Sequence, residues 1–194
     1  MASSNILLST ADGPTLTAAA RATALLPVQR IPIPANFWYP GRGLRVQVGG
    51  RISCAVTTPG TARFDFCLGA AGTTIVYDTG ALNLNIVAKA TVPFLLDVVL
   101  VCRSIGAGTA ATFFPLRGQF MSEAVVGAAL PSVATNGYLN CPVGTPGVGA
   151  GFDSTVPNVF DLFFTQAVGT GSMTIHALSL DLVSGLATAG YNFE

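Results

Sequence analysis

The sequence predicts an all-β fold, a two-sheet antiparallel β-sandwich that is jelly-roll-like and has an extended N-terminal arm. About eight segments have a strand pattern, either alternation of apolar and polar residues or a run rich in β-branched and aromatic residues, and turn-forming residues separate them. Hardly any segment has the periodicity of an amphipathic helix. Short strands with turn signals between them are typical of sandwiches and jelly rolls.

Charged residues are scarce for a chain of this size. They make up 9% of the 194 residues, apolar residues make up 51%, and the mean hydropathy is +0.60. One domain with a sizeable core is expected from this length. So few charged groups cannot cover the surface of a lone monomer, which indicates burial in an assembly or in a membrane. We expect no membrane span, because no uninterrupted apolar run reaches about 20 residues.

The N-terminal segment has neither the basic start nor the long apolar centre of a secretory signal, so we expect synthesis in a cytosol. The arginines are dispersed and balanced by acids, which argues against direct binding of nucleic acid. Arginine outnumbers lysine eight to one, and arginine is favoured in interfacial ion pairs. Four widely spaced cysteines are expected to be reduced and at least partly buried.

We assign residues 1–17 to an N-terminal arm and residues 18–194 to a single β-sandwich domain. The apolar patch Ile6, Leu7 and Leu8 lies in a polar context, which favours docking on a partner over a place in the core. The Ala-rich stretch Thr15–Leu26 fits a short helix or a first strand.

The strand pattern begins at Leu44–Val48, and Gly49-Gly50 is expected to bend the chain before Arg51–Val56. The alternating run 64–68 is expected to pair with the β-branched and aromatic run 73–77. The strongest strand, 91–103, is apolar on both faces, which predicts a central or covered position. It is expected to form a long hairpin with 110–123.

The C-terminal third begins with a loop-rich stretch, Val125–Thr155, which is too long for a simple connection and is expected to be functional or to hold local structure. Two strands follow, Val156–Ala167 and Ser172–Val183. The apolar phase of the last strand changes after Ile175, which predicts a β-bulge.

No pattern points to catalysis. His176 is the only histidine, and the sequence has no Gly-x-Ser-x-Gly turn that would supply a serine nucleophile for it to activate. Asp97 and Asp161 are the most suggestive carboxylate pair for a glycosidase, but each is expected to pair with an arginine such as Arg103, internally or across an interface. Asp153 fits a turn cap better than a calcium ligand. We therefore predict no enzyme activity, cofactor or metal.

The aromatic triplet Phe37, Trp38 and Tyr39 could plug the core, form a carbohydrate platform or anchor a protein interface, and we favour the core plug. The residues that we select as interface candidates are Ile6, Leu7, Leu8, Phe37, Trp38, Tyr39, Asp97 and Arg103.

Four stretches resemble small structural proteins of tailed bacteriophages: Ile33–Phe37, Leu44–Val46 with Gly50–Ser53, Leu96–Arg103, and Gly149–Ser154. The resemblance covers roughly Leu25 to Leu182 and rests on the order and spacing of these stretches. It implies a virion component of the capsid decoration or cement type, a class without catalytic residues.

This resemblance gives the functional expectation. The protein would bind the lattice of the major capsid protein on the virion surface and stabilise the shell, as a homo-oligomer with a trimer favoured, after synthesis in the host bacterial cytoplasm. Nucleic acid and membrane are not expected partners. The alternative is a tail-fibre or head-fibre module that recognises the host by binding carbohydrate. An enzyme would require two acids converging in one cleft.

Overall fold

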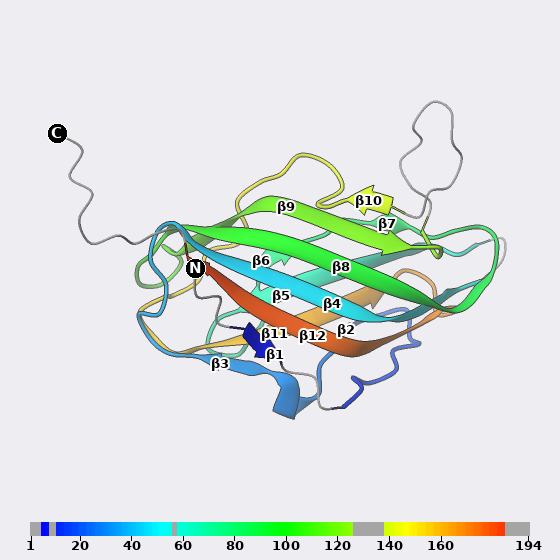
Figure 1. Cartoon of the computed structure of the whole chain (residues 1–194), viewed down its shortest axis with the longest axis horizontal. Coiled ribbons are helices and arrows are strands. Elements are labelled where there is room, and N and C mark those ends of the chain that lie inside the picture. Colours follow the sequence, from blue (N-terminus) through cyan, green and yellow to red (C-terminus); the bar gives the residue numbers. More distant parts are fainter. Residues whose placement is uncertain (1–4, 8–10, 56–57, 126–137, 185–194) are drawn as a thin grey trace.

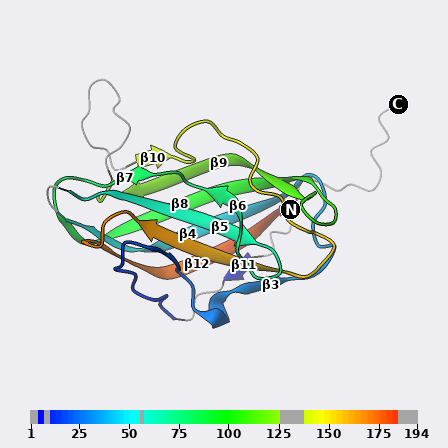
Figure 2. The same ribbon diagram turned by 180° about the vertical axis from the view of Figure 1, so that it is seen from behind.

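In a computed structural model the protein is a sandwich of two antiparallel β-sheets (Figures 1 and 2), which confirms the predicted fold class. The structure describes residues 5–7, 11–55, 58–125 and 138–184. The larger sheet has the strand order β1-β12-β4-β8-β9-β10, and the smaller has the order β2-β11-β5-β6, with β3 paired to β11 and β7 paired to β5. The strands are β1 (Asn5–Leu7), β2 (Arg21–Thr23), β3 (Ile31–Ile33), β4 (Arg42–Cys54), β5 (Thr61–Leu68), β6 (Thr74–Asp78), β7 (Leu82–Asn83), β8 (Lys89–Ser104), β9 (Thr112–Ser122), β10 (Tyr138–Asn140), β11 (Asn158–Gln166) and β12 (Ser172–Ser184).

The finer jelly-roll assignment stays a prediction. The chain crosses between the sheets from β4 to β5 and from β11 to β12, as a jelly roll requires. In contrast, β8 and β9 form a hairpin within the larger sheet, as the sequence predicted, and β5 and β6 form one within the smaller sheet. Strand β8 is central, between β4 and β9.

The core lies between the two sheets and is built from the apolar residues that alternate along the strands. Phe64 of β5 is at its centre: its ring lies 5.1 to 5.6 Å from those of Phe94, Phe120 and Phe164, which come from β8, β9 and β11. All four side chains are buried. The strand alternation of four distant segments thus converges on one aromatic cluster, with ring spacings that favour aromatic pairs.

A β-bulge lies where the sequence predicts a change of phase in the last strand. The register between β12 and β4 shifts between Ile175 and Ala177, opposite Gly50 and Gly49. A Cβ atom on Gly50 would lie 2.2 Å from the carbonyl oxygen of Thr174. The glycine pair therefore permits close approach of β12 at the bulge, whereas β4 itself runs unbroken through it.

The N-terminal segment lies along the edge of β12. Strand β1 pairs with Ser179–Asp181, and Leu16 forms a bridge with Met173. The described residues before position 18 are therefore paired with the sandwich, so the predicted boundary after residue 17 does not mark a free arm. Docking of Ile6 and Leu7 on a partner stays a prediction, and Leu8 lies outside the described residues.

Between residues 15 and 26 the structure has a strand, β2, rather than a helix. Across the described parts of the chain, the one helical element is a short 3-10 turn at Pro27–Gln29. No helix in those parts has the length and apolar character needed to cross a membrane.

The loop-rich stretch after Val125 closes one side of the sandwich in the part that is described. Strand β10 extends the larger sheet, and Phe152 packs between the layers with its ring stacked on Phe113 at 5.6 Å. Gly149 crosses the edge of β6 so closely that a Cβ atom would lie 1.9 Å from the carbonyl oxygen of Val76. This stretch thus holds local structure.

Replacement of Gly149 by alanine is expected to lower the free energy of unfolding by about 2 kcal/mol, because the added methyl group overlaps the backbone of β6. Gly147→Ala is the matched control in the same loop, since nothing lies within 4 Å of its Cβ position. Urea denaturation monitored by far-UV circular dichroism measures both. Equal stability of the two variants would contradict the close crossing.

Candidate protein-binding surface

The larger sheet has a broad outer face that Figure 1 views directly, with the smaller sheet behind it. Along β8 the buried side chains at positions 94, 96, 98, 100 and 102 face the core. The alternate positions form the outer face: Leu95, Asp97, Val99, Val101 and Arg103. The structure thus assembles the apolar second face of this strand into a surface, and none of the described strands forms a further layer over it.

Two apolar cross-strand pairs flank the centre of this face. Leu95 of β8 is opposite Met121 of β9, and each is 37% exposed. Val101 is opposite Phe114 in the same ladder, and both are half-buried. Between these pairs lies a polar band that includes Asp97 and Gln119. On β8 and β9 the outer face therefore has one apolar pair on each side of a mainly polar band, in which the buried Val99 is the apolar exception.

The polar centre is an ion-pair network around Asp97. Nε and Nη2 of Arg45 donate to the two carboxylate oxygens of Asp97 at 3.0 and 2.7 Å, and Nη2 of Arg117 lies 3.7 Å from Oδ2. The hydrogen bonds from Arg45 hold the pKa of Asp97 below its usual value. Bidentate pairs of this kind are geometrically fixed. A partner that covered this face would meet a carboxylate that is already paired.

Arg103 also lies on this face, but it is not the partner of either acid. Its guanidinium carbon lies 4.9 Å from the centre of the Phe114 ring. Within the molecule, Arg45 pairs with Asp97 and Arg30 pairs with Asp161. The expected pairing of each acid with an arginine is therefore confirmed, and pairing across an interface stays a prediction.

Asp161 lies in the other sheet, so the sandwich does not bring it together with Asp97. Its carboxylate is buried, accepts hydrogen bonds from the Thr23 hydroxyl and the Leu162 amide at 2.8 Å, and lies 3.0 Å from Nε of Arg30. Burial raises its pKa. Its neighbours Phe160 and Leu162 face the core, so Asp161 lies on the outer side of the smaller sheet. The two acids thus lie on opposite sides of the molecule.

The other candidate chemical groups are engaged in local structure. Oδ1 and Oδ2 of Asp153 accept hydrogen bonds from the Thr155 and Gly108 amides, as a loop-capping aspartate does. A hydrogen bond from the Thr155 hydroxyl, together with those from the two amides, lowers the pKa of Asp153. Nδ1 of His176 lies 2.6 Å from Oδ1 of Asp12, which connects β12 to the N-terminal segment.

All four cysteines are buried, and burial raises the pKa of the Cys67 and Cys141 thiols to about 12.

The aromatic triplet is divided between core and surface. Trp38 is buried, with its ring edge-on to Phe37 at 5.0 Å and to Phe113 at 4.8 Å, which confirms the core plug for this residue. Phe37 and Tyr39 are half-buried, and both rings contact the guanidinium of Arg42, at 4.3 and 4.2 Å. This guanidinium occupies one face of each ring, so neither ring has both faces open to a sugar.

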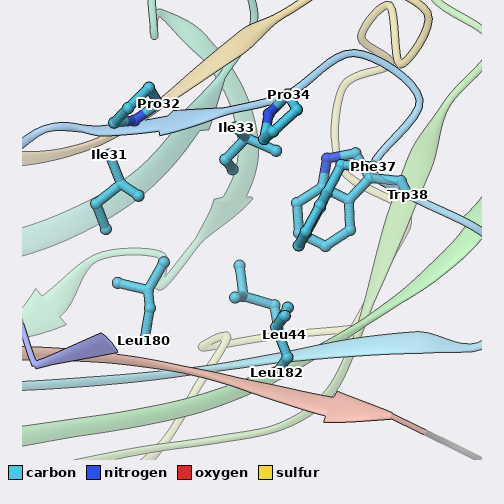
Figure 3. A pocket seen from close by; sticks show the side chains of 9 residues that line it. All are labelled: Ile31, Pro32, Ile33, Pro34, Phe37, Trp38, Leu44, Leu180 and Leu182. Atoms are coloured by element: carbon cyan, nitrogen blue, oxygen red, sulfur yellow. The ribbon is translucent and has the colours of Figure 1, made fainter. Parts of the chain in front are cut away.

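Beside this triplet lies an apolar groove of about 140 Å³ between β3 and the larger sheet (Figure 3). Figure 3 shows the side chains of β3 on one wall and those of β4 and β12 on the other, with the two aromatic rings closing one end. We call it the β3–β12 groove, and its lining residues are Ile31, Pro32, Ile33, Pro34, Phe37, Trp38, Leu44, Leu180 and Leu182.

Comparisons with known proteins assign no relationship. No protein-family model, no curated protein and no solved structure matches this chain.

Sequence reasoning selected Asp97 and Arg103 on the outer face but missed Arg45, Met121 and Phe114. Alternation places Arg45 and Met121 on the second face of their own strands. Phe114 is in phase with the core residue Phe120 in the sequence, and it lies on the outer face because the register of β9 shifts between the two. Their gathering around Asp97 depends on the strand order β4-β8-β9, of which only the hairpin of β8 and β9 is apparent in the sequence.

Proposed function

We propose that this protein is a non-enzymatic structural component of a bacteriophage virion, a decoration or cement protein that binds the major capsid protein and stabilises the shell. The outer face of the larger sheet would form the contact. The observation that carries the proposal is the composition of this face: apolar pairs flank an ion-pair network that needs no outside partner.

The physical argument concerns the cost of covering a surface. Burying apolar side chains is favourable by about 25 cal/mol per Å² removed from water, whereas burying an unpaired charge opposes binding. On this face the Asp97 carboxylate is already paired, and the apolar side chains of Leu95 and Met121 are partly exposed. A protein surface can therefore cover the face without stranding that carboxylate.

A single face of this kind also supports self-association, and we propose a homotrimer at three-fold sites of the capsid lattice. Charged residues make up only 9% of the whole chain, which agrees with a protein whose surface is largely buried in an assembly. The carbohydrate-binding fibre module is the weaker proposal, because the rings of Phe37 and Tyr39 that would stack on a sugar already contact Arg42.

Two measurements test the proposal. Sedimentation velocity of the purified chain at micromolar concentration is expected to show an oligomer, with the mass of a trimer. Densitometry of purified particles that carry the chain is expected to give a stoichiometry comparable to that of the major capsid protein, whereas a fibre would be present in few copies. A monomer in solution together with a low copy number on the particle would refute the decoration role.

A further inference from the structure

The outer face of the larger sheet, which Figure 1 views directly, carries an excess of positive charge. The charged side chains at the outward-facing positions of its central strands are Arg45, Arg51, Arg103, Arg117, Asp97 and Asp181. On the outer side of the smaller sheet, in contrast, each arginine is matched by an acid, in the pairs of Arg21 with Asp65, Arg30 with Asp161 and Arg63 with Asp78. The whole chain has no net charge, so the excess arises from where the strands place the charges.

Two arginines of this face lie at its opposite ends, each beside one of the apolar pairs. Arg51 lies in the next outward-facing row beyond the pair that contains Leu95. Arg103 lies two positions beyond the pair that contains Phe114, and its guanidinium carbon is over that ring. Both arginines are exposed. In the described part of the chain, no carboxylate oxygen lies within ion-pair distance of either one.

These guanidinium groups have donors that no acid of the described chain uses. A guanidinium carries five N–H donors in its plane, and stacking on an aromatic ring occupies its face rather than its edge. The contact of Arg103 with Phe114 therefore leaves its donors available. Arg117 is similar: its side chain is 53% exposed, and its nearest carboxylate, that of Asp97 at 3.7 Å, already forms a bidentate pair with Arg45. The planar fork of a guanidinium matches a carboxylate.

We propose that the outer face binds an acidic protein surface, whose carboxylates pair with Arg51, Arg103 and Arg117 while apolar side chains between them cover the two apolar pairs. This inference rests on the proposed function, because it describes the chemistry of the partner at that same face. Covering a guanidinium without giving it a partner opposes binding, whereas a carboxylate at the same place replaces the lost water. A neutral or basic partner surface could not supply that replacement.

The composition of the face favours protein over nucleic acid. A nucleic acid presents a continuous row of phosphates, and its binders have clustered basic residues. Here apolar pairs separate the arginines, and the Asp97 carboxylate lies near the middle of the face. The outer face of a second copy has the same positive excess, so two such faces packed together would oppose like charges. A cyclic trimer does not require that contact, because each of its interfaces joins two different surfaces.

An immobilised peptide tests this charge preference without a capsid. The probe is a short peptide in which glutamate alternates with leucine, and the matched probe has glutamine in place of glutamate. Biolayer interferometry at low ionic strength and low protein concentration is expected to show at least fivefold tighter binding to the glutamate peptide. The variant R51Q/R103Q should lose about tenfold in affinity for the glutamate peptide and little for the glutamine peptide, because neither arginine has an ion pair to lose within the chain.

The control variant R63Q/K89Q removes the same charge from surface ion pairs outside this face. It should bind the glutamate peptide as the natural protein does. Equal binding of the two peptides, or equal losses in the two double variants, would overturn the inference. Tighter binding to a single-stranded oligonucleotide of the same charge would assign the face to nucleic acid instead. Loss of self-association in R51Q/R103Q, with peptide binding unchanged, would assign the arginines to a second copy.

Attachment to particles separates this inference from the proposed function. A chain that binds the glutamate peptide through Arg51 and Arg103 but does not attach to particles would refute the capsid role and support the acidic-partner site. A chain that attaches to particles equally well with and without R51Q/R103Q, and that does not distinguish the two peptides, would support the capsid role and overturn the acidic-partner site.

Discussion

If the outer face is the contact that we propose, simultaneous replacement of Leu95 and Met121 by aspartate is expected to shift the protein from oligomer to monomer and to abolish its binding to the capsid. The two residues are cross-strand partners on the outer face, and each is 37% exposed. The double change removes the apolar pair and places two carboxylates where a partner would have to desolvate them. A loss of about 3 kcal/mol in association corresponds to roughly a hundredfold weaker binding.

The fold should survive this change, because both side chains face away from the core. The melting temperature is expected to fall by only a few degrees, while sedimentation velocity shows a shift to monomer. A matched control is the double variant V28D/I86D, which changes two exposed apolar residues that lie outside the larger sheet. If both double variants remain oligomeric, the outer face is not the contact. If both dissociate, the effect is one of general surface polarity.

Replacement of Arg30 by alanine is expected to lower the free energy of unfolding by about 2 to 3 kcal/mol at neutral pH, because it strands the carboxylate of Asp161. The side chain of Asp161 is 2% exposed, whereas that of Arg30 is 34% exposed. Solvent around Arg30 weakens the pair, so the expected loss is smaller than the roughly 3 to 5 kcal/mol that breaking a fully buried ion pair costs.

The loss should depend on pH in a defined direction. Burial raises the pKa of Asp161 in the folded protein, and Arg30 counteracts this effect. A carboxyl whose pKa is raised by folding binds more protons when folded than when unfolded, so stability falls as the pH rises from the unfolded pKa through the folded one. Without Arg30 the folded pKa rises further, and the deficit of Arg30→Ala relative to the natural protein should be larger at pH 7 than at pH 4.

Urea denaturation at a series of pH values measures this dependence. Lys89→Ala provides a control, because its partner Glu123 is 71% exposed and such surface pairs contribute less than about 1 kcal/mol. A deficit for Arg30→Ala that is small and independent of pH would show that Thr23 and the Leu162 amide suffice to hold the carboxylate.

Most of the strand content follows from local patterns in the sequence. The hairpin of β8 and β9, the pairing of β5 with β6 and the bulge in β12 all correspond to alternation, turn residues and a change of apolar phase. The sequence reveals these features because side chains alternate between the two faces of a strand, so a strand with one buried face has an apolar residue at every second position. The core plug that we favoured for the triplet Phe37, Trp38 and Tyr39 rests instead on the tendency of large aromatic side chains to be buried, and only Trp38 of the three is buried.

Only the tertiary structure decided which side chains meet. Asp97 pairs with Arg45 because β4 lies next to β8, and Asp161 lies on the opposite side of the molecule because β11 belongs to the other sheet. The pairing of β1 with β12 likewise joins residues more than a hundred positions apart, and so does the β3–β12 groove. Alternation specifies which face of a strand is buried, but it carries no information about which distant strand becomes its neighbour, since any apolar face can cover any other.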